Sequence, residues 1–325
     1  MHKEKMVTAL CLVLILLNAC TAKAEPDKVT VQLKWVHQAQ FAGFYVAEEM
    51  GYFEDENLDV ELIEGGPGID IIHAVTSGEA DFAVAAPNEL IVEIANGADL
   101  KAIATTYQIS PIVFVAMADS GISRPQDFVG KKVAALNNSD YELQLRAMMK
   151  FLDIDINAIE LKEHGYSTEQ LASGEIDVHG FYATGGLLRL QNAGYDVNLI
   201  YPGDYGVHFN TDALIAADSM LDSRPDVTTR FLRALFRGWH DALQNTDESV
   251  QIIMHYALES DPNLQREMLE ASIPLISTGD RPIGTMDEAS WQAMHDALLD
   301  QDIIADPIPL DEILSPTLID SIEIE

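Results

Sequence analysis

The chain has 325 residues, 53 Asp or Glu against 19 Lys or Arg, and a formal net charge of −34. Such a surface repels nucleic acid, because phosphate binding requires clustered Lys and Arg side chains. It also repels anionic lipid head groups, so contact with a membrane requires a separate anchor. The length favours two lobes over a single core. Solubility explains the acidity, and a preference for cationic or neutral ligands is the alternative.

The N-terminal segment has the pattern of an export signal. A short basic stretch precedes an apolar run at 6–17, which is too short to span a bilayer as a helix. A small residue then precedes Cys20, as in the lipobox of bacterial lipoproteins. We therefore expect a signal peptide at 1–19, a lipid anchor at Cys20 and a tether to residue 28. An ordinary signal peptide cut slightly further on is the alternative.

The residues after the tether alternate between strand and helix patterns. Strands are expected at 29–33, 58–63, 81–86, 101–106 and 112–117. Helices are expected at 39–50, at 69–77 and from Pro87, a residue that suits a first helical turn. This order predicts a first lobe with a mainly parallel sheet covered on both faces.

The same rhythm restarts near Ser120. Strands of a second, smaller sheet are expected at 132–136, 159–162, 176–179 and 197–200. A helix at 139–152 follows the first of them, with Asn138 or Ser139 as its cap. A strand at 211–216 returns to the first lobe, and a long amphipathic helix is expected at 225–245. Because open α/β sheets bind ligands beyond the carboxyl ends of their strands, the two lobes predict a cleft that closes by hinge bending.

Four stretches, in a fixed order, carry a family resemblance. They lie at residues 33–60, 69–87, 130–133 and 202–239. Together they resemble the periplasmic binding proteins named for thiamine pyrimidine synthase, whose relatives bind pyrimidine precursors of thiamine, sulfonates or riboflavin. The resemblance implies an α/β, type II periplasmic-binding fold, with lobe 1 at 29–115 plus 212–325 and lobe 2 at 116–211.

The resemblance also implies partners, and the N-terminal segment implies a location. The resemblance implies an ABC permease and its ATPase as partners. From the N-terminal segment we expect the monomeric protein to lie outside the cytoplasm, held at the membrane only through the lipid anchor. A binding protein that docks on a signalling receptor is one alternative. Sulfonate capture is another, for which Lys34 and Arg189 are the candidate cations. The expected ligand is a small planar nitrogen heterocycle, such as a formylated aminopyrimidine.

Three candidate ligand contacts lie between the first strand and the first helix. Trp35 offers a flat indole for stacking on a ring, and the resemblance implies that this Trp lines the pocket. A core Trp packed under the helix is the alternative. His37 is a candidate hydrogen-bonding group that titrates near neutral pH. Gln40 opens the first helix, whose amides are expected to face the cleft.

Further candidates follow later strands. Gly65 and Gly66 allow close approach of the backbone to a ligand, or only a sharp turn. Asn88 has both a donor and an acceptor, which suits the edge of a pyrimidine. From the second lobe, Asn137 and Ser139 follow a strand and are expected to close over the ligand.

One site position departs from the pattern of the relatives. Tyr182 and Thr184 lie in a YATGG stretch where relatives commonly have Asn-Glu-Pro after an aromatic residue. An acidic contact implied by the resemblance is therefore missing. Asp204 and Tyr205, in the segment returning to the first lobe, are the candidate replacements.

An enzyme is the rival class. Thiamine pyrimidine synthase, similar in fold, consumes one of its own histidines and carries a Cys-rich iron motif. Here residues 87–89 read Pro-Asn-Glu, and both cysteines lie in the export segment. The histidines show no metal-ligand spacing, and no nucleophile elbow is present. We therefore expect a binding protein without a metal or cofactor.

Overall fold

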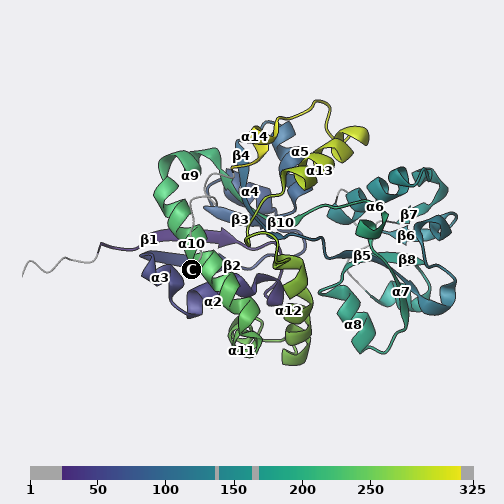
Figure 1. Cartoon of the computed structure of the whole chain (residues 1–325), viewed down its shortest axis with the longest axis horizontal. Helices are drawn as coiled ribbons and strands as arrows, with labels where there is room; N and C mark the ends of the chain where they lie inside the picture. Colours follow the sequence, from purple (N-terminus) through teal and green to yellow (C-terminus); the bar gives the residue numbers. More distant parts are fainter. Residues whose placement is uncertain (1–23, 136–138, 163–167, 316–325) are drawn as a thin grey trace, which may run out of the picture.

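The protein has two lobes side by side, each built on a five-stranded sheet with helices packed around it (Figure 1). The computed structural model describes residues 24–135, 139–162 and 168–315. This architecture confirms the α/β, two-lobed prediction.

The sheet of lobe 1 has the strand order β2-β1-β3-β10-β4. Its strands are β1 (Asp27–Gln32), β2 (Leu58–Ile63), β3 (Phe82–Ala85), β4 (Leu100–Tyr107) and β10 (Thr211–Ala217). Strand β1 runs parallel to β2 and β3, whereas β10 runs antiparallel to both of its neighbours. The sheet is therefore mixed rather than mainly parallel, because β10 enters it from the other lobe.

The sheet of lobe 2 has the order β7-β6-β8-β5-β9. Its strands are β5 (Ile112–Met117), β6 (Lys132–Ala134), β7 (Glu160–Lys162), β8 (Val178–Tyr182) and β9 (Val197–Ile200). The prediction that 112–115 belongs to lobe 1 is wrong, because β5 pairs antiparallel with β8 and β9 in the second sheet. With β5 included, this sheet has as many strands as the first, and it is smaller only in that its strands are shorter.

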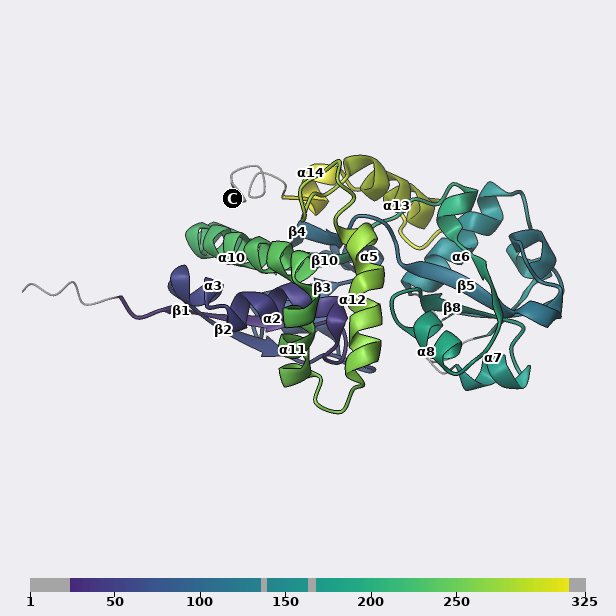
Figure 2. The ribbon, with the colours of Figure 1, turned by 60° about the horizontal axis from the view of Figure 1, so that its bottom comes forward.

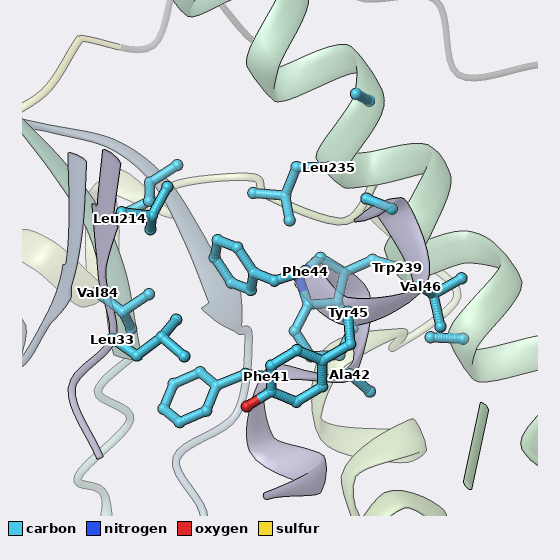
Figure 3. Packing of buried hydrophobic residues seen from close by; sticks show 14 of the residues in the cluster. Leu33, Phe41, Ala42, Phe44, Tyr45, Val46, Val84, Leu214, Leu235 and Trp239 are labelled. Atoms are coloured by element: carbon cyan, nitrogen blue, oxygen red, sulfur yellow. The ribbon is translucent and has the colours of Figure 1, made fainter. Parts of the chain in front are cut away.

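The helices of lobe 1 cover both faces of its sheet. They are η1 (Ala39–Phe41), α2 (Ala42–Glu49), α3 (Tyr52–Asp55), α4 (Ile71–Thr76), α5 (Pro87–Ala95), α9 (Asp218–Ser223), α10 (Pro225–Gln244), α11 (Thr246–Tyr256), α12 (Pro262–Ile276), α13 (Glu288–Asp300) and α14 (Leu310–Ile313). Apolar residues of α2 and α10 form one core with the sheet, including Phe44, Leu235 and Trp239 (Figure 3). Those of α5 and α13 contribute to the core on the other face.

Two glycines allow α2 and α10 to pack closely. A Cβ atom on Gly238 would lie 2.3 Å from the carbonyl oxygen of Gly43, and one on Gly43 would lie 2.2 Å from the Trp239 ring. Because side chains there would separate the helices, α2 is fixed against α10 and its N-terminal end is held near the end of β1.

Lobe 2 contacts lobe 1 through more than one of its helices. The helices of lobe 2 are η2 (Ala118–Ser120), η3 (Pro125–Phe128), α6 (Asp140–Phe151), η4 (Ile156–Ala158), α7 (Glu169–Ser173), α8 (Gly186–Asn192) and η5 (Pro202–Tyr205). Ser139 caps α6 by accepting a hydrogen bond from the amide of Glu142. The lobes touch where α6 contacts α5 and α13, and where α8 contacts α12 (Figure 2).

The chain crosses between the lobes twice, after β4 and before β10. The side-chain amide of Asn210 donates to the backbone oxygen of Gln108 over 2.9 Å, so the two crossing segments are bonded to each other. The amide of Gln108 donates in turn to the oxygens of Thr105 and Thr285. These bonds fix the hinge to lobe 1.

Candidate functional site: the cleft between the lobes

A cavity of about 2050 Å³ lies between α4, α5 and α13 of lobe 1 and α6 of lobe 2. Four of the predicted site residues line it, namely Trp35, Gly66, Asn88 and Ser139. The cavity exceeds the volume of a typical small-molecule site. Those four residues come from both lobes.

The topology explains why these residues meet. Trp35 follows the carboxyl end of β1, and Asn88 follows the carboxyl end of β3. Because β1 and β3 are parallel neighbours, both ends open at the same edge of the sheet. Pro87 at the first turn of α5 lets the helix begin there without an unsatisfied amide.

A charged cluster joins the lobes beside this edge. Lys34 of lobe 1 donates to Asp212 Oδ1 over 3.1 Å, to Asp140 Oδ2 over 3.3 Å and to the Tyr182 hydroxyl over 3.0 Å. Asp140 and Tyr182 belong to lobe 2. An ammonium group has three donors, so the cluster uses all of those of Lys34.

The cluster is shielded from solvent. The exposed side-chain fractions are 19% for Lys34, 9% for Asp140 and 2% for Asp212. Burial lowers the pKa of Lys34, but Asp140, Asp212 and Glu89 outweigh it and hold that pKa well above its ordinary value. Burial, with Asp140 and Asp212, raises the pKa of the Tyr182 hydroxyl, which therefore stays protonated.

Asp212 is held in position by its backbone and by Gln40. Its φ angle is 54°, a left-handed conformation that Asp tolerates better than most residues do. The Gln40 amide donates to Asp212 Oδ2 over 2.6 Å. Gln40 thus supports the charged cluster, and it is not among the residues that line the cavity.

Several other predicted residues lie away from the cavity lining. The His37 Nδ1 atom is 2.9 Å from the Tyr45 hydroxyl, in an aromatic group with Tyr256. Gly65 is where the backbone passes β1 so closely that a Cβ atom would lie 2.1 Å from the oxygen of Leu33. Thr184 is buried.

The proposed acidic replacements are also outside the lining. Asp204 is exposed on η5, and Tyr205 packs into the core beneath α6. Asn137 and Cys20 lie outside the described residues. An acidic group that the sequence analysis did not single out, Glu89, does line the cavity, in the first turn of α5.

Asp140 and Asp212 were not predicted as site residues either, and Lys34 was predicted only as a partner for an anion. The one available signal was position, since Lys34 and Glu89 each follow a strand of the predicted sheet. In a chain with 53 carboxylates, the presence of a particular one is uninformative.

The outer wall of the cavity carries further charges. Arg146 is paired with Glu142 at 2.6 Å on α6, and Lys150 with Asp300 of α13 at 2.6 Å. Among the described residues, no group of His, Cys, Asp and Glu is arranged to hold a metal ion. None of the helices in the described ranges is long and apolar enough to cross a membrane.

Two α/β lobes joined by two crossings, with a cavity between facing strand ends, define a periplasmic-binding fold. The structure is similar to that of the periplasmic aliphatic sulphonate-binding protein SsuA of Escherichia coli, with a TM-score of 0.73 and 14% identity over 92% of this chain and 96% of that one. The model of the NMT1/THI5-like family matches residues 38–249, more than half of the chain. The protein belongs to that family.

Two relatives match along nearly their whole length. The formylaminopyrimidine-binding protein of Halalkalibacterium halodurans is 26% identical over 97% of this chain and 99% of the relative. The riboflavin-binding protein RibY of Chloroflexus aurantiacus is 23% identical over 96% of this chain and 97% of the relative. Both are named as binding proteins.

Proposed function

We propose that the protein captures a small, planar, nitrogen-containing heterocycle between its lobes and acts as the solute-binding lipoprotein of an ABC uptake system. The proposed class of ligand rests on Trp35 and Asn88, which both line the cavity at the same edge of the lobe 1 sheet. The indole provides a stacking surface, and the amide provides one donor group and one acceptor for a ring edge. The two relatives named for pyrimidine and flavin ligands support this assignment.

The charged cluster argues against sulfonate capture. A free cationic side chain would favour an anion in the cleft, but Lys34 already donates to three oxygens within the protein. Arg189, the other candidate cation, is exposed on α8 and does not line the cavity. A binding role without catalysis is further supported by the names of the relatives that match the full length.

A thermal-shift screen tests the ligand class. We expect 4-amino-5-hydroxymethyl-2-methylpyrimidine, its formylated amine relatives or riboflavin to raise the melting temperature, and alkanesulfonates to leave it unchanged. Ligand at about 100 times its Kd stabilises the folded state by about 2.7 kcal/mol, because it binds only that state. A shift with sulfonates alone, or turnover of any of these compounds, would contradict the proposal.

The anchor is proposed at Cys20, which follows the apolar N-terminal run. We expect the Cys20→Ser protein to leave the membrane fraction and appear among soluble exported proteins, because a serine cannot accept the thioether-linked lipid. Cell fractionation with immunoblotting measures this. Unchanged membrane association of the variant would argue for attachment by another route.

A further inference from the structure

The inner end of the cavity has more negative than positive charge. Glu89 lines the cavity, while Asp140 and Asp212 lie behind Lys34 beside it. Glu89 is coupled to this cluster, since burial raises the pKa of its carboxyl, Lys34 lowers it and Asp140 raises it further. The Glu89 side chain is exposed to the cleft, although protein surrounds it at longer range, and no Lys, Arg or His nitrogen in the described ranges lies within 4.0 Å of it.

The charges at this end do not cancel. Three carboxylates face one ammonium, and the first turns of α5 and α6 add the positive ends of two helix dipoles, each worth about half a charge. The net charge at the inner end of the cavity is therefore about −1. An uncompensated charge is costly in a partly buried site, and its field acts strongly on a ligand there.

The charges on the outer wall of the cavity do not indicate the charge of the ligand. Seven carboxylates and three Lys or Arg side chains line the cavity, a proportion close to that of the whole chain. Arg146 and Lys150 are paired with carboxylates, so neither leaves a free cation for a ligand. The inner end differs from the outer wall because Glu89 lies near the buried carboxylate of Asp140, which raises the pKa of Glu89.

We propose that the cleft prefers ligands with one positive charge beside the planar ring, an ammonium or a quaternary nitrogen, and that Glu89 is the counter-ion. The proposal rests on the proposed function, since it assumes that the ring stacks on Trp35. In the first turn of α5, Glu89 is one residue from Asn88, so one short segment presents both the amide for the ring and the carboxylate for the charge. Asp140 of lobe 2, which contacts Lys34, adds to the negative field at Glu89.

Two pyrimidines of the same size test this preference. Isothermal titration of the full chain compares 4-amino-5-aminomethyl-2-methylpyrimidine, protonated at neutral pH, with the neutral 4-amino-5-hydroxymethyl-2-methylpyrimidine. We expect the amine to bind at least about tenfold more tightly, and Glu89→Gln to remove most of that difference. Glu93→Gln, one turn further along α5 on the outer wall, is the matched control and keeps the preference.

The outcomes separate this proposal from the ligand class itself. Equal or tighter binding of the neutral pyrimidine, or a preference that persists in Glu89→Gln, overturns the cation preference and leaves the planar-ligand proposal standing. Binding of riboflavin but of neither pyrimidine also overturns the cation preference and leaves the planar-ligand proposal standing. Failure of every planar heterocycle overturns both. Melting curves without ligand show whether each variant is folded.

Discussion

Replacing Lys34 with Met is expected to destabilise the protein by about 3 kcal/mol, because it leaves Asp212 and Asp140 buried without their cation. The Gln40 amide and the Tyr182 hydroxyl still donate to these carboxylates, which keeps the cost near the lower end of the range for broken buried pairs. A fall in melting temperature of at least about 5 °C should follow. Calorimetry or circular dichroism measures it.

The chain offers a matched control for this substitution. Lys150 pairs with Asp300 across the same two lobes, but both side chains are more than half exposed. Lys150→Met should change stability by well under 1 kcal/mol, because water and salt screen an exposed pair. In the double variant Lys34→Met/Asp212→Asn, much of the lost stability should return. A double variant no more stable than Lys34→Met would show that the cluster is not held together by charge.

Trp35→Ala is expected to weaken binding of a planar heterocycle by about 30-fold. Stacking contributes about 0.5–1.5 kcal/mol, and the apolar ring area buried against the ligand adds a similar amount. Trp35→Phe keeps an aromatic face and should retain most of the affinity. Isothermal titration measures both variants.

The effect on affinity must be separated from an effect on folding. One part of Trp35 packs against the core of lobe 1, so the melting temperature of each variant without ligand is the control. Affinity that is unchanged in Trp35→Ala would assign the indole to the core alone, the alternative considered from the sequence. It would also remove stacking from the proposed function.

The local sequence pattern predicted the helices and strands of this fold well. It did not predict which sheet each strand joins. Strand β5 occupies the predicted residues, because its apolar run is a local property. Its sheet was assigned wrongly, because a buried strand has the same pattern whichever lobe it joins. The amphipathic helix α10 and the Ser139 cap were predicted correctly for the same reason, since both depend on neighbouring residues.

The site shows the same division. Trp35 and Asn88 were predicted because each follows a strand, and the ends of parallel strands meet at one edge. The pairing of Lys34 with Asp140 and Asp212 joins residues 106 and 178 positions apart, and the contact with Asp140 also depends on how the lobes pack. Tyr182 was expected at the ligand, but its hydroxyl is used within that cluster. Whether a side chain such as Tyr182 contacts the ligand or the charged cluster depends on the tertiary structure, which the local sequence does not reveal.

The insertion of lobe 2 between β4 and β10, whose crossing segments are joined by the bond between Asn210 and Gln108, affects the stability of lobe 1. Strands β4 and β10 are neighbours in its sheet, yet lobe 2 separates them in the chain. Closing a flexible loop of about 100 residues, rather than one of four, costs about 3 kcal/mol more in chain entropy. A folded lobe 2 brings its own ends together and removes most of that cost. Folding of the inserted lobe therefore stabilises the lobe that it interrupts.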